Sequence, residues 1–159
     1  MTPPPVTLDT PDASAPVTRA RIARQLQQRG HTFSDGSAEN CFDLKIADSP
    51  LSVCVHEGRG ILSVRGQWET DLPYDQVEYP LFAATDSWNR KNPFPTLYTV
   101  EDSDGAAVVV ADFSALISAG MHDAHLDEAL SVGLEQGKQA LKYLRGVAER
   151  ILGFSQRDQ

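Results

Sequence analysis

Four side chains on two neighbouring predicted strands are of the types that bind metal ions. They are Cys41, Asp43, Cys54 and His56. Thiolate, carboxylate and imidazole are all zinc ligands, so a metal-binding sensor or enzyme is one hypothesis for this chain. The spacing argues against it, because structural zinc sites usually carry ligand pairs on turns, whereas these four lie on flat strands. The alternative is that two half-buried cysteines lie beside two polar surface residues.

The strand register that the sequence favours also argues against a disulfide. A two-residue turn at Asp48 and Ser49 puts Cys41 opposite His56, which leaves Cys41 and Cys54 as diagonal neighbours. Diagonal neighbours on an antiparallel pair lie about 7–8 Å apart, beyond comfortable bridging range. We therefore expect no bond between the two cysteines.

A pair of histidines precedes the last predicted helix. His122 and His125 are three residues apart, and an i, i+3 pair on a helix can hold a metal ion. The competing interpretation is structural. In it, His122 caps the helix, and Asp123 and Asp127 complement the positive end of the helix dipole. We favour the structural interpretation.

No motif diagnostic of catalysis occurs in the chain. The GxSxG pattern, the P-loop and the dinucleotide-binding fingerprint are all missing from the sequence. Catalytic triads can also assemble from residues far apart in sequence, which motif spacing does not detect. We predict a non-catalytic protein and assign it no catalytic residue and no cofactor.

Composition and charge narrow the class of partner. The chain has 159 residues, 41% of them hydrophobic, and a formal net charge of −8. This charge disfavours nucleic acid and anionic membranes, which are themselves polyanions. No apolar run approaches the roughly 20 residues of a membrane-spanning helix. The first sixteen residues lack the basic start and apolar stretch of a signal peptide, so we predict a cytoplasmic protein.

Proline content predicts where the folded domain begins. Residues 1–16 hold five of the ten prolines and few large apolar residues, so this stretch cannot offset its ordering entropy. We predict a disordered tail over 1–16, a single domain over 17–154, and a short C-terminal tail over 155–159. The length suits one compact domain.

Apolar periodicity predicts an α+β fold. Helices and strands are expected in the order α-βββ-α-ββ-α, with an antiparallel sheet that has its helices packed on one face. The helices are placed from Thr18 to Gly30, from about Pro80 to Pro93, and from about Asp123 to about Leu152. The strands are placed at 41–47, 51–57, after the EGRG turn, and in TLYTVED and AAVVVADF. Gly58 and Arg59 at the centre of a type II′ turn would place Val53 opposite Val64.

Three short motifs and this order of elements resemble the YbjN domain family. The motifs are SWN (87–89), FPTLYTVED (94–102) and AGMHDAHLDEAL (119–130). The family consists of bacterial domains with a fold like type III secretion chaperones, described as sensory-transduction regulators, and the resemblance covers about residues 17–153. It implies a binding module, often a homodimer, that grips an extended peptide segment. It supplies no catalytic residues.

Two regions are candidates for contacting such a partner. The first helix carries Arg19, Arg21 and Arg24 without an acidic residue, and this face is either solvated or a docking surface for an acidic segment. Trp88 shares a helix face with Leu81 and is expected in the core. Phe94, on the loop that follows, is left as an aromatic that could stack on a peptide.

The last helix predicts a homodimer. Gly133 and Gly137 are one turn apart, which suggests close approach of either the sheet or a partner helix. Tyr143 and Val147 form an apolar stripe beside the one that contains Leu141. Because one sheet face covers only one stripe of a helix, we predict that the two glycines, Tyr143 and Val147 form a dimer interface.

Overall fold

A six-stranded antiparallel sheet in the order β1-β2-β3-β4-β6-β5 forms the centre of the protein. The computed structural model describes residues 14–157. The strands are β1 (Phe33–Asp35), β2 (Cys41–Ile46), β3 (Ser49–His56), β4 (Ile61–Pro73), β5 (Thr96–Glu101) and β6 (Ala106–Leu116). The sequence does not predict β1, because only three residues pair and none of them is fully buried.

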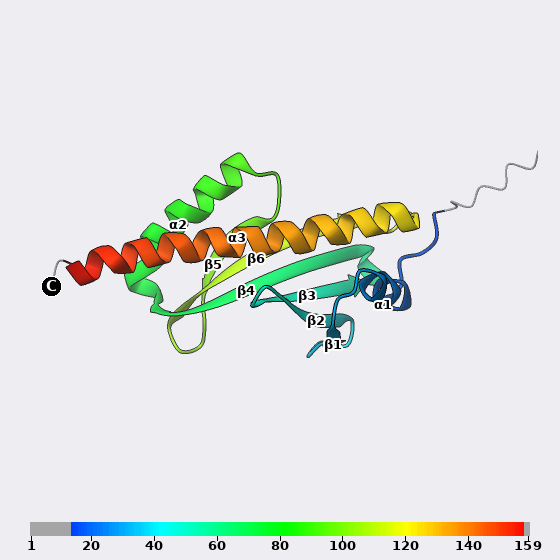
Figure 1. Cartoon of the computed structure of the whole chain (residues 1–159), viewed down its shortest axis with the longest axis horizontal. Helices are drawn as coiled ribbons and strands as arrows, with labels where there is room; N and C mark the ends of the chain where they lie inside the picture. The colour runs from blue at the N-terminus through cyan, green and yellow to red at the C-terminus, as the bar shows by residue number, and fades with distance from the viewer. Residues whose placement is uncertain (1–13, 158–159) are drawn as a thin grey trace, which may run out of the picture.

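All three long helices of the described residues cover one face of this sheet, and none of residues 14–157 forms a helix on the other face (Figure 1). They are α1 (Arg19–Gln28), α2 (Tyr74–Lys91) and α3 (Asp123–Arg157), and a 3-10 turn, η1 (Glu57–Arg59), joins β3 to β4. Helix α3 runs along the length of the sheet (Figure 1). The predicted α+β class, with helices on one face, is confirmed.

The alternation of apolar residues places the core on the helical face. Val53 and Val55 of β3 and Leu62 and Val64 of β4 are buried there under α1 and α3. Val53 pairs with Val64, so the predicted register of this hairpin is confirmed. The turn differs from the predicted type II′ turn, because η1 is followed by Gly60 in the left-handed conformation at φ 65°.

The register predicted for the first hairpin is wrong by two residues. Phe42 faces Val53, and the turn residues are Ala47 and Asp48 instead of Asp48 and Ser49. Both have positive φ, at 48° and 66°, as a type I′ turn requires. The sequence conceals this turn, because alanine rarely adopts that conformation. A shift of two residues leaves every side chain on its predicted face.

Helix α2 begins six residues before the predicted start. Pro80 lies inside the helix, where its ring removes one backbone donor, although a proline is most typical of the first turn. The Tyr74 amide donates to the Gly105 carbonyl at 2.9 Å, which ties the start of α2 to the β5–β6 hairpin. As predicted, Trp88 and Leu81 are buried on one face of this helix.

Gly133 and Gly137 of α3 face the chain's own sheet. A Cβ atom at Gly133 would lie 2.7 Å from Val64, and one at Gly137 would lie 3.3 Å from Leu51. Both glycines therefore allow close helix-on-sheet packing and present no surface to a partner helix, contrary to the predicted interface. Tyr143 packs on Trp88 of α2, with ring centroids 5.5 Å apart.

The second apolar stripe of α3 is thus partly covered within the chain at Tyr143 and Val147. Tyr143 and Val147 both pack against the cluster of core residues that α2 shares with the sheet. An uncovered stripe therefore does not by itself require a homodimer through α3, because α2 covers part of Tyr143 and Val147. The homodimer itself stays a prediction.

The folded domain extends beyond both predicted boundaries, at residues 17 and 154. The Ala15 carbonyl accepts the Met121 amide at 3.0 Å, and Arg21 donates to the carbonyls of Ala15 and Pro16, so these residues belong to the folded part. Helix α3 continues to Arg157, beyond the predicted limit at residue 154. The remainder of the two predicted tails, residues 1–13 and 158–159, lies outside the described residues.

Candidate partner-binding groove

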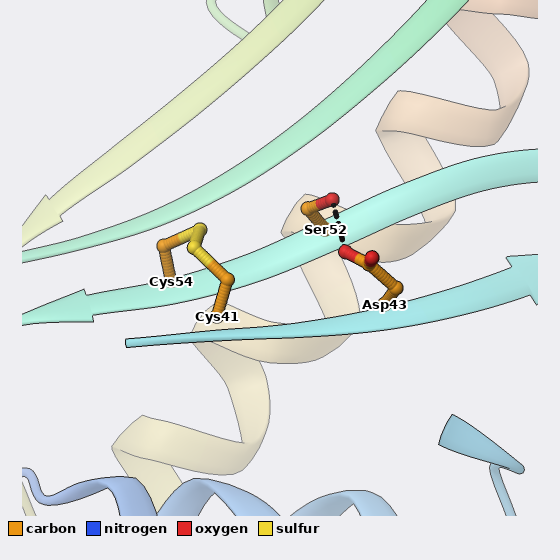
Figure 2. Close-up of a disulfide and its surroundings, with 4 residues drawn as sticks. All are labelled: Cys41, Asp43, Ser52 and Cys54. Atoms are coloured by element: carbon orange, nitrogen blue, oxygen red, sulfur yellow. Dashed lines mark hydrogen bonds between the residues drawn. A yellow bond between two sulfur atoms is a disulfide. The ribbon is translucent and has the colours of Figure 1, made fainter. Parts of the chain in front are cut away.

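The two cysteines of the predicted metal cluster form a disulfide (Figure 2). The Val55 amide donates to the Asn40 carbonyl at 3.0 Å, which makes the neighbouring pair, Cys41 and Cys54, a non-hydrogen-bonded pair. In such a pair the strands approach most closely, and the two Cα atoms are 4.1 Å apart. The expectation of two unbonded cysteines is wrong because it rested on the wrong register.

The disulfide removes both thiolates from the metal-binding hypothesis. Asp43 accepts a hydrogen bond from the Ser52 hydroxyl at 2.7 Å (Figure 2), and His56 lies beyond the end of β2, next to the turn. Within residues 14–157, no three potential metal ligands come together. We therefore do not retain the proposed Cys/His/Asp site.

The acidic residues near the start of α3 pair with one arginine in α1 and with the arginine at its C-cap. Asp123 accepts from Arg21 at 2.9 Å, and Asp127 accepts from Arg29 at 2.6 Å. These contacts fasten α1 to the first turns of α3, which supports a structural role for the acidic residues of this segment. His125 is exposed and lies on the same helix.

The predicted basic docking face is largely used inside the chain. Arg19 binds Asp35 at 2.6 Å and lies 4.1 Å from the ring of Phe42, and Arg21 binds Asp123. Arg24 is exposed. Two of the three arginines that were candidates for binding a partner therefore already hold α1 in place.

The other candidate, Phe94, is 40% exposed and packs edge-on against Phe113, with ring centroids 5.5 Å apart. Trp88 is buried, and its indole N–H donates to the Pro95 carbonyl at 3.1 Å. The SWN motif thus anchors the loop between α2 and β5, as expected for Trp88.

A groove between α2 and the outer edge of β5 holds the most exposed aromatic residues of the described chain. Tyr79 is 85% exposed and Phe82 is 64% exposed, both on the side of α2 that faces away from the core. The groove has a volume of about 340 Å³. Its walls are Tyr74, Glu78, Tyr79, Phe82, Thr85, Asp86 and Asn89 of α2, and Leu97, Tyr98 and Thr99 of β5.

Asn89 shows which backbone groups of β5 face this groove. Its side-chain oxygen accepts the Leu97 amide and its nitrogen donates to the Leu97 carbonyl, both at 2.9 Å. Leu97 therefore points away from β6, and alternation makes Thr99 and Glu101 point the same way. The structure gives neither of these two residues a backbone partner on the outer side within the described chain.

An unpaired strand edge beside aromatic side chains can accept an extended peptide. The free amide and carbonyl of Thr99 would pair with its backbone, and the rings of Tyr79 and Phe82 would cover its apolar side chains. Glu78 is exposed, while Asp86 binds Arg90 at 2.9 Å. Electrostatics in the groove therefore favours a segment with a basic residue near Glu78.

Sequence reasoning missed this groove because it placed the start of α2 too late. A helix from Pro80 contains neither Tyr74 nor Tyr79, so the exposed aromatic face could not be recognised. The usable clue was Phe82, which lies off the apolar stripe of Leu81 and Trp88. The free edge of β5 depends on strand order, which no local pattern determines.

An antiparallel sheet with its helices on one face and a groove at the sheet edge define a small α+β protein. The sequence matches the YbjN family, described as "Putative bacterial sensory transduction regulator", over residues 18–145. The chain belongs to this family, and the resemblance drawn from the sequence is confirmed. No curated protein matches the sequence.

Solved structures share the fold at low sequence identity. YbjN from E. coli, whose structure is described as that of "a putative transcription regulator", is 14% identical, with a TM-score of 0.68 over 86% of this chain and 97% of that one. An uncharacterised protein from Methanothermobacter thermautotrophicus is 9% identical, with a TM-score of 0.55 over 82% of this chain and 98% of that one. A chain of the HopA1–SchA chaperone–effector complex is 16% identical, with a TM-score of 0.47 over 84% and 99%.

None of the helices in the described part of the chain combines the length and the apolar composition needed to cross a membrane.

Proposed function

We propose that this protein is a non-catalytic module of regulatory or chaperone-like role that binds an extended segment of a partner protein. The observation that carries the proposal is the outer edge of β5, unpaired at Thr99 and flanked by the exposed rings of Tyr79 and Phe82. Edge strands are usually short, charged or covered, since an open edge invites another strand. An open edge beside large exposed apolar side chains is therefore typical of a binding surface.

The occupant is an extended segment that adds to the sheet beside β5. Asn89 pairs with the backbone of Leu97, and the backbone of the segment would pair with the next outward-facing residue of β5, Thr99. Alternate apolar side chains would lie against Tyr79 and Phe82, and a lysine or arginine would meet Glu78. A second copy of this chain fits less well, because a symmetric contact would bring the acidic residues of the two grooves together.

The experiment places a photo-crosslinking residue, benzoylphenylalanine, at position 82 of the full chain in its native host. The matched control carries the same residue at Leu116, which is 80% exposed on β6. We expect discrete crosslinked partners at position 82 alone. Adding Thr99→Pro should abolish them, because proline removes the outward amide, and an edge strand tolerates proline at such a position.

Three results would contradict the proposal. Identical crosslinks at positions 82 and 116 would show nonspecific contact. Crosslinks that survive Thr99→Pro would show that strand addition is not involved. A product with twice the mass of the chain would identify the groove as a homodimer interface.

A further inference from the structure

A pocket of about 390 Å³ lies at the start of β5, beside the loop that follows α2. The loop and β5 contribute Pro93, Phe94, Thr96 and Tyr98 to its walls, and β6 contributes Asp112, Phe113 and Ser114. The indole of Trp88 donates to the Pro95 carbonyl at 3.1 Å, so α2 holds the loop that carries Phe94. The pocket therefore has fixed walls on both strands and on the loop.

The polar side chains of this pocket lie on the open face of the sheet, the face that no helix of the described residues covers. Leu97 pairs with Ala111, and both are buried in the core on the helical face. Thr96 pairs with Asp112, one position along each strand, so alternation directs these two side chains to the open face. The pocket is thus distinct from the groove at β5, with which it shares only Tyr98.

Asp112 is the one charged residue that lines this pocket within the described chain. Its Oδ2 accepts a hydrogen bond from Arg65 at 2.9 Å, and this bond raises the pKa of Arg65 above its ordinary value. Its Oδ1 is buried and has no hydrogen-bond partner among residues 14–157. Because a carboxylate has about four acceptor sites, Asp112 keeps acceptor capacity beside its bond with Arg65.

A donor in the pocket can reach this carboxylate from the side that Arg65 leaves free. Arg65 pairs with Asp112 from β4, whereas the pocket lies on the β5 side, where Thr96 pairs with Asp112. The Asp112 side chain is 22% exposed, and the terminal torsion of an aspartate is soft. A small rotation therefore presents Oδ1 to a donor in the pocket.

Two aromatic rings form the apolar part of the pocket. Phe94 is 40% exposed and contacts Phe113 edge-on, and Tyr98 is half-buried. A cation beside an aromatic ring is attracted by the ring quadrupole, and a carboxylate adds a charge-assisted hydrogen bond. Thr96 and Ser114 are exposed, and their hydroxyl groups can accept further hydrogen bonds from the same cation. These groups together suit a compact cation with several N–H donors on a short apolar chain.

We propose that this pocket binds a primary alkylammonium group, which donates a hydrogen bond to Oδ1 of Asp112 while its alkyl chain lies against Phe94 and Tyr98. A free aliphatic amine and a lysine side chain both carry this group. The net charge of −8 adds a general attraction for a cation. The proposal does not depend on strand addition at Thr99, because it requires no backbone pairing.

The test is a titration of the full chain with n-pentylammonium, followed by amide NMR shifts, which detect weak binding. The matched probe is n-pentanol, which has the same apolar chain and no charge. We expect n-pentylammonium to shift the Thr96 and Ser114 amides. It should bind about tenfold more tightly than n-pentanol, because it alone makes the charge-assisted hydrogen bond.

Lysine blocked at both ends distinguishes the two sources of the group. Binding as tight as that of n-pentylammonium would assign the pocket to a lysine side chain of a protein. Much weaker binding than that of n-pentylammonium would assign it to a free amine.

Two variants test the two parts of the pocket. Asp112→Asn should remove the preference for n-pentylammonium over n-pentanol, whereas Asp43→Asn, at an aspartate of the open face outside the pocket, should preserve it. Because Asp112 also binds Arg65, its replacement could disturb the sheet, so Phe94→Ala provides a second variant. It leaves Asp112 in place and should weaken binding of n-pentylammonium several-fold, whereas Phe82→Ala, at an exposed aromatic residue outside the pocket, should not.

Three results would overturn the proposal. Equal binding of n-pentylammonium and n-pentanol would show that the carboxylate is not involved. Binding that is unchanged in both Asp112→Asn and Phe94→Ala would show that the cation binds elsewhere on an acidic surface. Shifts confined to Phe82 and Thr99 would place the amine in the groove at β5, and would leave strand addition there untouched.

Discussion

The side chain of Asn89 pairs with the first part of the outer edge of β5, which is otherwise open. Its amide replaces the two backbone hydrogen bonds that another strand would make with Leu97. The Leu97 side chain is buried, so the strand is held against α2 at this point and becomes open two residues later. One residue thus sets the limit between the closed and the open part of β5.

Replacing Asn89 by alanine should lower the free energy of unfolding by about 1–3 kcal/mol, because the Leu97 amide and carbonyl lose their partners. Asn92→Ala is the matched control, since the Asn92 side chain donates one hydrogen bond, to the Trp88 carbonyl. Urea unfolding of both variants provides the measurement. A smaller loss for Asn89→Ala than for Asn92→Ala would show that the double contact with Leu97 is not significant.

The disulfide is expected to stabilise the hairpin of β2 and β3. It joins residues 13 positions apart, and closing a loop of that size contributes about 3 kcal/mol in the chain-entropy model. The double variant Cys41→Ser, Cys54→Ser should unfold at a correspondingly lower urea concentration. It should also be insensitive to a thiol reductant, whereas the reductant should lower the midpoint of the wild type. A wild-type midpoint that is unchanged by complete reduction would refute this.

At the scale of elements, the position of α3 depends on how closely its backbone approaches the sheet. Gly133 lies over Val64 and Phe113, where no side chain fits. Farther along the same helix, Gly146 has nothing within 4 Å of the place where a Cβ atom would lie. The two glycines therefore differ in what requires them. Close packing of α3 on the sheet requires a glycine at position 133, whereas no neighbouring atom requires one at position 146.

Alanine at these two positions should have opposite effects. Gly133→Ala should destabilise the protein by about 1–3 kcal/mol, because the added methyl group forces α3 away from Val64. Gly146→Ala should stabilise it by up to about 1 kcal/mol through helix propensity alone. Thermal unfolding followed by circular dichroism compares the two. If both variants are stabilised, α3 is not pressed against the sheet at Gly133.

For the whole molecule, the segment before α1 contributes to the fold. Ala15 pairs with Met121, and the Arg21 guanidinium donates hydrogen bonds to the carbonyls of Ala15, Pro16 and Met121. This contact joins the beginning of the folded chain to the start of α3, more than a hundred residues later.

Two truncated chains measure this contribution. A chain that begins at Val17 should melt several degrees below one that begins at Ser14, because it lacks the carbonyls that Arg21 and the Met121 amide bind. The chain that begins at Ser14 is the control for removing the preceding residues. Equal melting temperatures would restore the original prediction that all of residues 1–16 form a tail.

The predicted homodimer can be tested at the same scale. Light scattering compares the wild type, Val147→Glu and Phe82→Glu. Because Val147 packs against the core cluster under α2, its replacement should lower stability without changing the mass of any assembly. If a dimer forms and Phe82→Glu separates it, the groove at β5 is the interface. A wild-type mass near 17.4 kDa would contradict the dimer.

Much of the architecture could be predicted from local sequence because it follows from periodicity. Val53, Val55, Leu62 and Val64 alternate along their strands, and this alternation alone assigns their side chains to the buried face. The faces of α2 were likewise predictable from the spacing of Leu81 and Trp88. The family was recognisable for the same reason, since the order of elements is itself a sum of local patterns.

The sequence by itself determined the fold class, the residues of the core and the family. Tertiary structure alone decided the disulfide, the partial cover of α3 and the free edge of β5. Cys41 meets Cys54 only because Ala47 and Asp48 adopt a turn that their residue types do not announce. Tyr143 is partly covered because it packs on Trp88 of α2, and Thr99 is unpaired because β5 is the last strand of the sheet. Each of these depends on a contact between segments far apart in the chain, and local periodicity carries no information about such contacts.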